Sequence, residues 1–405
     1  MSGTIAVVGA GQAGGWAART LRDQGYDGRV LLVGAERHPP YERPPLSKGM
    51  LTGGATPGGA TIFTAPALAE LRVEWRPGVE CLSIDRDRRR AILSEGEAIQ
   101  YDELILCTGG RARTLIVPGA ELPGVFTLRT MEDAAAIAGR FAPGRRLVAI
   151  GGGWIGLEVA ASARKAGLEA TVVEAESRLC ARTIPPVASS YLRSLHEGHG
   201  TQVRLGVGVE CIARTAEGAL AVTLGSGEVL PADIVVIGVG LVPNDELARQ
   251  AGLECRGGIE VDAQCRTSDP HIFAAGDVTA VFSRWYGRRL RLESWQNAQD
   301  QGVAAAKAAL GKDVSYDPLP RFWSDQYDVT VQILGCIAAE RGETVVRQHP
   351  ESGRLLVFLV DGNRLLGVLG VKAAADLSKA RRILQKDKPV LVESLRDPEF
   401  DLGSV

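Results

Sequence analysis

Two short apolar runs, each followed by a glycine-rich turn and a helical pattern, open two similar segments of the chain. Thr4 to Val8 leads into the turn GAGQAG and a helix to about Gln24, and Leu147 to Ile150 leads into GGGWIG and another helix. A second apolar run follows each helix, at Arg29 to Val33 and at Ala170 to Val173. Short apolar runs bounded by glycine are typical of strands buried on both faces of a parallel sheet. The pattern predicts two βαβ units of the same design.

Four other segments indicate how the rest of this region is organised. Leu104 to Gly110 and Ile234 to Gly240 are apolar runs that end on glycine, as expected where the chain leaves one sheet and enters another. His271 to Asp277 is predicted to be a short strand that ends at the start of a helix. Thr52 to Thr61 is rich in glycine and is predicted to be a surface loop.

The pattern changes at about residue 320. Strands are predicted at Thr330 to Leu334, Leu355 to Val360 and Leu365 to Val371, and a basic helix from about Ala374 to Gln385 stops before Pro389. The fold class predicted for the whole chain is α/β, with two Rossmann-like dinucleotide-binding domains and a C-terminal α+β domain.

Composition fits this organisation and excludes several classes of protein. At roughly 150 residues per domain, 405 residues suggest two or three domains. With 46 basic and 48 acidic residues the net charge is −2, which does not point to nucleic acid. The start of the sequence has no basic, apolar signal segment, and no apolar run is long enough to span a bilayer. We therefore expect a cytoplasmic protein that binds neither nucleic acid nor membrane.

The cysteines favour neither disulfides nor a metal site. None forms C-x-x-C or has zinc-ligand spacing, so the prediction is free thiols in a reducing cytosol and no bound metal. The seven positions are Cys81, Cys107, Cys180, Cys211, Cys255, Cys265 and Cys336.

The first glycine loop has the spacing G-x-G-x-x-G between a strand and a helix. This spacing lets the backbone approach a pyrophosphate, which the helix N-terminus can bind through its free N–H groups. The next strand is followed by Glu36, where a ribose diol needs an acceptor. Strand, spacing, helix and acid together favour a dinucleotide site over a simple tight turn. Its glycines are Gly9, Gly11 and Gly14.

The second loop has the same form, with Gly151, Gly153 and Gly156. Glu174 ends the following strand, and an acid there accepts from the adenosine ribose and repels a 2′-phosphate. This favours NADH over NADPH. Arg178 and Arg182 lie close behind, either on a solvated loop or in contact with the cofactor, so the preference is not absolute.

Two dinucleotides in one chain suggest hydride transfer between a nicotinamide and a flavin. Asp277, in the late Ala-Ala-Gly-Asp segment, is placed to accept from a ribityl hydroxyl, which assigns FAD to the first unit. Glu158 lies in the first turn of the second helix. The helix dipole alone could explain an acid there.

The sequence resembles the FAD-dependent NAD(P)H:ferredoxin reductases, flavoproteins with two dinucleotide-binding folds. The likeness is strongest to the reductase component of Rieske-type aromatic ring-hydroxylating dioxygenases, with putidaredoxin and rubredoxin reductases as near relatives. It covers essentially the whole chain. Its motifs are the first glycine loop, Pro40 to Lys48 (PYERPPLSK), Gly151 to Glu158, Thr267 to Val278, Glu293 to Ala298 (ESWQNA) and Phe322 to Gln326 (FWSDQ).

The resemblance implies a glutathione-reductase-like arrangement of domains. The FAD-binding domain is split between residues 1–110 and 241–319, the NAD-binding domain spans residues 111–240, and the C-terminal α+β domain spans residues 320–405.

The resemblance also implies which residues contact the cofactors. The predicted FAD-binding residues are Gly9, Gly11, Ala13, Gly14, Glu36, Arg43, Lys48, Val79, Thr108, Gly109, Arg129, Asp277 and Trp295. The predicted NAD-binding residues are Gly151, Gly153, Trp154, Ile155, Gly156, Glu158, Glu174, Arg182 and Gly240.

Three of the matched positions are expected to act in catalysis. Lys48 corresponds to a lysine near flavin N5, where its charge stabilises a reduced, anionic flavin. Glu158 corresponds to a glutamate near the nicotinamide carboxamide and the flavin, and Trp323 to an aromatic that packs beside the isoalloxazine. Trp154 stands where the family usually has a smaller residue, so it either crowds the nicotinamide entry or packs on the C-terminal domain.

Residues 37–80 contain no cysteine, although disulfide reductases of this group carry a Cys-x4-Cys pair there and peroxidases and oxidases a single redox cysteine. Electrons are therefore expected to leave directly from the flavin to a one-electron acceptor. Two alternatives remain: an NADH oxidase or peroxidase, and a redox-switched interaction flavoprotein.

The predicted function is an NADH:ferredoxin oxidoreductase that passes electrons through FAD to a [2Fe–2S] ferredoxin of Rieske or plant/adrenodoxin type. That ferredoxin would supply a Rieske dioxygenase in aromatic hydrocarbon catabolism, or alternatively a cytochrome P450 or a rubredoxin chain. The protein is expected to be a monomer or homodimer. Ferredoxins of these systems are typically acidic, so two basic clusters are candidates for docking, although each is also consistent with a solvated surface. They are Arg284, Arg288, Arg289 and Arg291, and Lys379, Arg381, Arg382, Lys386 and Lys388.

Overall fold

The computed structural model describes residues 3–216, 218–338, 342–349 and 351–405. The chain divides into two compact units, and each is described by itself. Unit 1 consists of Met1–Arg43, Pro57–Arg111 and Leu241–Pro318. Unit 2 consists of Pro44–Thr56, Ala112–Gly240 and Leu319–Val405.

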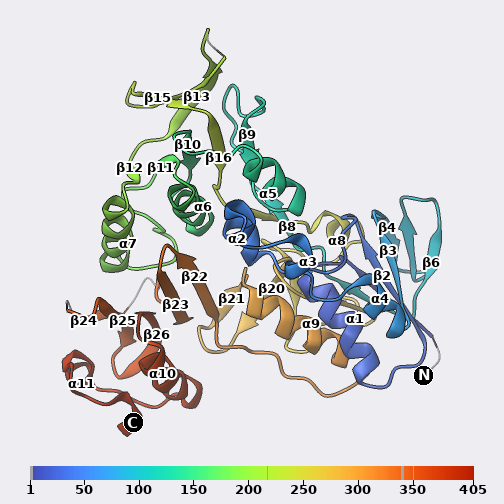
Figure 1. The fold of residues 1–405 in the computed structure, drawn as a ribbon. Helices are drawn as coiled ribbons and strands as arrows, with labels where there is room; N and C mark the ends of the chain where they lie inside the picture. The colour runs from blue at the N-terminus through green and yellow to red at the C-terminus, as the bar shows by residue number, and fades with distance from the viewer. Residues whose placement is uncertain (1–2, 217, 339–341, 350) are drawn as a thin grey trace. The chain divides into compact units, whose positions relative to one another are not determined.

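A parallel five-stranded sheet forms the centre of unit 1, in the order β19-β7-β1-β2-β3 (Figure 1). Its strands are β1 (Thr4–Val8), β2 (Arg29–Gly34), β3 (Val73–Pro77), β7 (Glu103–Leu106) and β19 (Ile272–Ala274). Helices α1 (Gln12–Asp23) and α9 (Trp295–Ala309) lie side by side and share a core cluster with this sheet. A Cβ added to Gly302 of α9 would meet the carbonyl oxygen of Ala13 at 2.4 Å, so small residues allow the two helices their close approach.

Smaller elements complete unit 1. One antiparallel sheet contains β4 (Cys81–Asp85), β5 (Arg90–Leu93) and β6 (Ala98–Gln100), and a mixed sheet contains β18 (Ile259–Val261), β20 (Thr279–Ser283) and β21 (Arg288–Leu290). The short helices are α3 (Pro57–Ala60), α4 (Ala65–Glu70) and α8 (Glu246–Gln250). Strands β8 (Gly110–Ala112) and β17 (Leu241–Pro243) pair where the chain passes from one unit to the other.

Unit 2 repeats the same strand plan in its first sheet, whose order is β12-β11-β10-β16-β9 with all strands parallel. Its strands are β9 (Val125–Thr127), β10 (Arg146–Ile150), β11 (Glu169–Glu174), β12 (Gln202–Leu205) and β16 (Ile234–Ile237). Its helices are the 3₁₀ helix η1 (Pro44–Ser47), α2 (Gly49–Thr52), α5 (Met131–Ala138), α6 (Trp154–Lys165) and α7 (Pro186–Gly198). An antiparallel sheet of β13 (Val209–Arg214), β14 (Leu220–Leu224) and β15 (Val229–Ala232) shares a core cluster with the parallel sheet.

The C-terminal part of unit 2 is an antiparallel sheet in the order β22-β23-β26-β25-β24. Its strands are β22 (Arg321–Gln326), β23 (Val329–Gly335), β24 (Glu343–His349), β25 (Arg354–Asp361) and β26 (Arg364–Val371). Helix α10 (Ala374–Lys386) buries Leu377, Ala380 and Leu384, spaced as one apolar face, against this sheet. The chain ends with α11 (Val392–Arg396) and the 3₁₀ helix η2 (Leu402–Ser404).

The predicted fold class is confirmed, because two parallel α/β sheets of the same topology accompany a C-terminal α+β region. Two local predictions are wrong. Asp277 does not start a helix: it lies in a turn between β19 and β20, since Thr279–Ser283, which includes the strand-favouring Thr279, Val281 and Phe282, continues as a strand. Pro57–Ala60, in the predicted surface loop, forms the short helix α3. The three-domain division stays a prediction, and Pro44–Thr56 groups with unit 2.

Candidate functional site

The two glycine loops have nearly identical backbone geometry. Gly9 and Gly151 both have φ of +108°, a region that favours glycine. A Cβ on Gly14 would lie 1.8 Å from the carbonyl oxygen of Gly9, and one on Gly156 would lie 2.0 Å from that of Gly151. The first and third glycines of each loop are therefore required by the turn and by close helix–strand packing.

The middle glycines behave differently. A Cβ added to Gly11 would meet no atom within 4 Å, and one on Gly153 only the carbonyl oxygen of Gly238 at 4.0 Å. Each of these glycines caps the N-terminus of its helix, α1 or α6, without a side-chain hydrogen bond. Open space beside free helix N–H groups is what a pyrophosphate needs.

Glu36, just beyond β2, is held by two neighbours in unit 1. Tyr41 Oη donates to Glu36 Oε2 at 2.5 Å, and Arg43 Nη2 lies 2.6 Å from Glu36 Oε1. The Arg43 side chain also donates to Tyr41 Oη at 3.0 Å. The sequence predicted Glu36 and Arg43 as FAD contacts, and the structure brings them together. Tyr41, also in the Pro40 to Lys48 motif, was not predicted to take part.

The remaining predicted FAD residues of unit 1 surround the carboxyl ends of β1, β2, β7 and β19. Ala13 is 3.0 Å from where a Cβ on Gly276 would stand, so the Gly276–Asp277 turn lies against the start of α1. Thr108 Oγ1 donates to the Asn244 carbonyl at 2.7 Å, and Asn244 N donates to the Gly109 carbonyl. Val79 is buried beside Gly34, and Trp295 is the first residue of α9.

Glu174 fixes the second loop from the end of β11. Its carboxylate accepts from the backbone N–H of Gly152 at 2.6 Å and from that of Glu176 at 2.8 Å. The acid predicted to contact the adenosine ribose is thereby oriented at the mouth of the glycine loop.

The most buried charge among the predicted site residues is Glu158, whose exposure is 4%. Lys48 Nζ lies 2.9 Å from Glu158 Oε2, and Ser47 Oγ donates to the same oxygen at 2.5 Å. Ser47 is in turn fixed by Ser162 of α6, which donates to the Ser47 carbonyl at 2.7 Å. Two predicted catalytic residues, 110 positions apart, therefore form one buried ion pair.

A third side chain completes the Glu158 site. Ser324 of β22, which is fully buried, donates to Glu158 Oε1 at 2.6 Å. A buried carboxylate is costly unless cations and hydrogen-bond donors surround it, and here three side chains do so. Ser47 and Ser324 were not predicted as site residues, although both lie inside quoted motifs.

Trp154 contacts an aromatic residue of β22, and Trp323 lies next to that residue on the same strand. The rings of Trp154, at the start of α6, and Phe322, on β22, are 4.9 Å apart between centroids. Trp154 thus packs on the C-terminal part of unit 2, one of the two possibilities left open by the sequence. Because strand residues alternate, Trp323 projects to the opposite face of β22 from Phe322 and Ser324.

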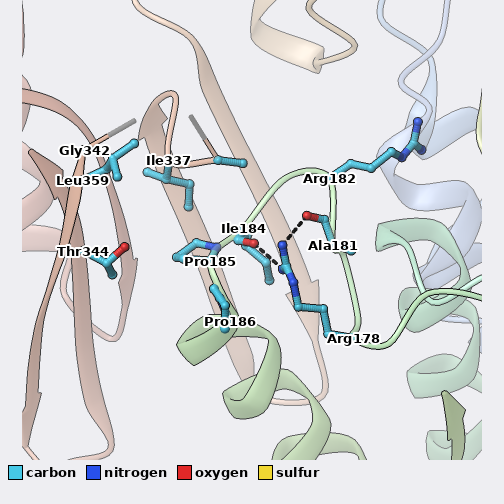
Figure 2. A pocket seen from close by; sticks show the side chains of 11 residues that line it. Arg178, Ala181, Arg182, Ile184, Pro185, Pro186, Ile337, Gly342, Thr344 and Leu359 are labelled. Carbon is cyan, nitrogen blue, oxygen red and sulfur yellow. Dashed lines mark hydrogen bonds between the residues drawn. The ribbon is translucent and has the colours of Figure 1, made fainter. Parts of the chain in front are cut away.

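The two arginines of the loop after β11 have different contacts. Arg178 donates to the carbonyls of Ala181 and Ile184, both at 2.6 Å, and to Ser189 Oγ at 3.0 Å, which commits it to holding the loop (Figure 2). Arg182 extends away from Arg178 in Figure 2 and lies beside Gly240, where its Nη2 would be 3.5 Å from an added Cβ. Both arginines line a cavity of about 310 Å³.

Two more predicted site residues, Arg129 and Ile155, lie at the starts of helices α5 and α6. The Arg129 backbone N–H donates to Asp133, which also caps α5. Ile155 is 42% exposed at the start of α6.

Comparison with known proteins places these features in a family. Residues 3–302 match the family model described as pyridine nucleotide-disulphide oxidoreductase, and residues 321–405 match the model described as reductase C-terminal. Rhodocoxin reductase of Rhodococcus erythropolis is 43% identical, over 98% of this chain and 93% of that protein. The anthranilate 1,2-dioxygenase system ferredoxin--NAD(+) reductase component of Burkholderia cepacia is 39% identical, over 98% and 97%.

The chain belongs to the pyridine nucleotide-disulphide oxidoreductases, among the ferredoxin--NAD(+) reductases. A solved structure, the ferredoxin reductase for the CYP199A2 system of Rhodopseudomonas palustris, agrees: its TM-score is 0.95 at 40% identity, with 99% of each chain covered. The predicted enzyme class and the predicted cofactors, FAD and NADH, are confirmed by this membership.

The reductase fits FAD at its first loop. The side-chain nitrogen and oxygen of Gln12, between Gly11 and Ala13, are buried and have no hydrogen-bond partner among the described residues. Buried amides normally have partners, so this one marks a place where a ligand with polar groups would complete the loop. Gly11, Gln12 and Glu36 would hold the pyrophosphate and ribose, while FAD itself supplies hydride and single-electron chemistry.

Two cysteines of the reductase, Cys81 and Cys107, are held as protonated thiols, which are poor nucleophiles. Burial raises the pKa of the Cys81 thiol to about 11 and that of Cys107 to about 12. No disulfide and no metal-binding group of three or more acidic, His or Cys side chains occurs in the part of the chain that the structure describes. Within the same residues, no helix is both long and apolar enough to cross a bilayer.

We expect His196, which is fully buried near the end of α7, to make stability depend on pH. Burial lowers the pKa of His196 from 6.5 to about 4, with Gln326 opposing and His199 adding to the shift. Above pH 6.5 both states are neutral; between pH 6.5 and 4 only the unfolded chain gains a proton. Stability is therefore lost as pH falls, by about 3 kcal/mol in all.

Urea unfolding between pH 7 and 4 checks this expectation. The His196→Gln variant is the control, because it keeps a polar side chain but removes the titrating group. The wild type should lose about 3 kcal/mol more than the variant over this range. Parallel losses in the two proteins would contradict it.

Proposed function

We propose that this reductase passes electrons from NADH, through FAD, to a [2Fe–2S] ferredoxin that supplies an oxygenase. The observation that carries the proposal is the buried Glu158, paired with Lys48 and bonded to Ser324, at the helix that begins with the second glycine loop. Two dinucleotide loops with open middle glycines support the same relay. Proximity of the two cofactors is the main catalytic device.

We assign the residues the roles that the sequence predicted. Unit 1 contributes Glu36, Arg43, Asp277 and the first loop to FAD. Unit 2 contributes Glu174, Arg182 and the second loop to NADH. Lys48 and Glu158 stabilise charge and orient the reacting groups, and Trp323 packs against the flavin ring. The FAD domain at residues 1–110 and 241–319, the NAD domain at 111–240 and the C-terminal domain at 320–405 are part of this proposal.

The terminal oxygenase is proposed to be a Rieske dioxygenase of aromatic hydrocarbon catabolism. The anthranilate and benzene dioxygenase reductases support this choice. The relative that serves the CYP199A2 system favours a cytochrome P450 equally well, so this is the second candidate. A cytoplasmic location and a monomeric or homodimeric state complete the proposal.

Anaerobic stopped-flow spectroscopy tests the function. We expect NADH to reduce the bound FAD faster than NADPH does, because Glu174 is fixed beside the second glycine loop, where a carboxylate would repel a 2′-phosphate. Mixing the reduced protein with [2Fe–2S] ferredoxins of both oxygenase classes then identifies the acceptor. Failure to reduce any ferredoxin, together with rapid turnover of peroxide or oxygen, would contradict the proposal and favour an oxidase or peroxidase.

The second basic cluster is the better candidate for ferredoxin docking. In the first cluster, Arg284, Arg289 and Arg291 have acidic partners: Asp317, Glu260 and Glu293. In the second, Lys379 pairs with Asp401, whereas Arg381 and Arg382 are exposed on α10. Within the described parts of the chain, neither of these two arginines forms an ion pair. Their charge is therefore available to an acidic partner.

We predict that replacing Arg381 and Arg382 by Gln slows ferredoxin reduction about three- to tenfold at low salt. Reduction of ferricyanide, which needs no docking surface, should change less than twofold or so. Neutralising the exposed Arg90 and Arg214, which likewise form no ion pair within the described residues, is the matched control. Equal effects of the Arg381/Arg382 change on both acceptors would count against a docking role.

A further inference from the structure

A row of buried polar side chains extends from Glu158 into the interior of unit 2. Gln326 Nε2 lies 3.1 Å from Ser324 Oγ, and Gln326 Oε1 lies 2.9 Å from His196 Nε2. Tyr327 Oη lies 3.3 Å from His196 Nδ1 and 2.8 Å from Thr201 Oγ1. We call Ser324, Gln326, His196, Tyr327 and Thr201 the Glu158 chain. None of its members is more than 8% exposed.

The direction of each hydrogen bond follows from the carboxylate at the end. A carboxylate accepts only, so Ser324 donates to Glu158 and must accept from the Gln326 amide nitrogen. The Gln326 oxygen then faces His196, which donates from Nε2 and leaves Nδ1 as an acceptor. Nδ1 is served by the Tyr327 hydroxyl, whose oxygen accepts from Thr201. Every donor in the chain therefore points toward Glu158.

The protonation states agree with this direction. Burial lowers the pKa of His196 to about 4, so the imidazole is neutral with its proton on Nε2. Burial also raises the pKa of Tyr327, so its hydroxyl stays a donor. Hydrogen bonds that share one direction polarise each other and strengthen the last of them.

Tyr327, at the end of the Glu158 chain that lies away from Glu158, is held by several contacts. Tyr327 opens the two-residue turn between β22 and β23 with φ of +57°, a strained conformation for a side chain of this size. Lys165 of α6 donates to the Tyr327 carbonyl, and the exposed ring of His199 stacks on Tyr327 at 3.8 Å between centroids. Helices α6 and α7 thereby hold the turn that carries Gln326 and Tyr327.

We propose that Ser324, Gln326 and His196 are positioning residues that fix the Glu158 carboxylate for reaction with NADH. Ser47 and Lys48 hold one oxygen, Oε2, and the Glu158 chain holds the other, so the plane of the carboxylate cannot rotate. The chain is not a proton path, because the Gln326 amide cannot readily pass a proton on. The kinetic part of this inference rests on the proposed function; the coupling between His196 and Glu158 does not.

The experiment combines histidine NMR with kinetics on the FAD-loaded protein. The whole protein has five histidines, so ¹⁵N-histidine labelling gives a spectrum in which His196 can be assigned. We expect His196 to keep the neutral Nε2–H tautomer down to about pH 5. Glu158→Gln and Ser324→Ala should each move its ring resonances. Ser324→Ala should also slow reduction of FAD by NADH about tenfold, the loss expected for one hydrogen bond to a charged group.

Two further variants keep the test decisive. Tyr327→Phe removes the far donor but keeps the ring, and should slow FAD reduction only about two- to threefold while shifting His196 Nδ1. It replaces Ser324→Ala if that variant fails to fold. Tyr26→Phe is the matched control, because Tyr26 of unit 1 is as buried as Tyr327 and lies outside both the Glu158 chain and the predicted cofactor sites. It should leave both His196 and the rate unchanged.

Two results would overturn the inference: His196 resonances that do not respond to Glu158→Gln, or Ser324→Ala and Tyr327→Phe variants that react as fast as Tyr26→Phe. If NADH does not reduce the wild-type protein, the proposed function fails. The response of His196 to Glu158→Gln then still decides whether the chain couples the two residues.

Discussion

Replacing Glu158 by Gln slows the reduction of bound FAD by NADH about 10- to 100-fold, the equivalent of one hydrogen bond between charged groups. Glu158 Oε2 accepts from Ser47 and forms an ion pair with Lys48, and Oε1 accepts from Ser324. A glutamine at this position places an NH₂ group, itself a donor, against one of these donors. It also leaves the half-buried Lys48 without its counter-charge.

Anaerobic stopped-flow reduction measures this effect, and absorbance of the flavin measures FAD content. FAD should remain bound, because the loop and the acid predicted to hold it lie in unit 1. Glu228→Gln is the control: Glu228 pairs with Arg204 in the same unit, but on the surface. An unchanged rate in Glu158→Gln would remove Glu158 from the reaction.

A double-mutant cycle separates the ion pair from each residue alone. Lys48→Met should cost less rate in the Glu158→Gln background than in the wild type, because the partner is already neutral. Additive costs would mean that Lys48 and Glu158 act independently, in spite of the 2.9 Å between them.

Sequence reasoning succeeded where the chemistry is local. The glycine spacing, the flanking strands and the acid at the end of the second strand all lie within about 30 residues, and the structure contains both loops as expected. Such signals are set by backbone geometry and need no knowledge of distant packing.

Contacts between distant segments could not be predicted in this way. The helix dipole alone explains an acid at position 158, so there was no reason from the sequence to expect a partner for it. Lys48 and Ser324 come close to Glu158 only in the folded protein. Trp154 likewise could not be placed before its contact with Phe322 was known, 168 residues later. The pairings of the Glu158 chain join α7, β22 and the following turn, and no spacing in the sequence relates them.

Local sequence preferences indicated the correct structure at both positions where the prediction was wrong. The residues after Asp277 include three β-branched residues, Val278, Thr279 and Val281, which favour a strand over the predicted helix. Pro57, at the first position of α3, is a common helix start even in glycine-rich surroundings.

Alanine at Gly153 weakens NADH binding about tenfold or more without unfolding the protein, and alanine at Gly11 does the same for FAD. Both glycines have φ near −80° and extended ψ, which alanine adopts freely, and a Cβ would meet no protein atom closer than 4.0 Å. A simple tight turn would tolerate either change, whereas a pyrophosphate lying against the loop would not.

Titration with NADH under anaerobic conditions and the FAD content of the purified protein measure the two effects, with urea unfolding as the check on folding. Alanine at Gly58, in open space outside both loops, is the control. Wild-type affinity in Gly153→Ala would mean that the nicotinamide cofactor does not bind with its phosphates at this loop.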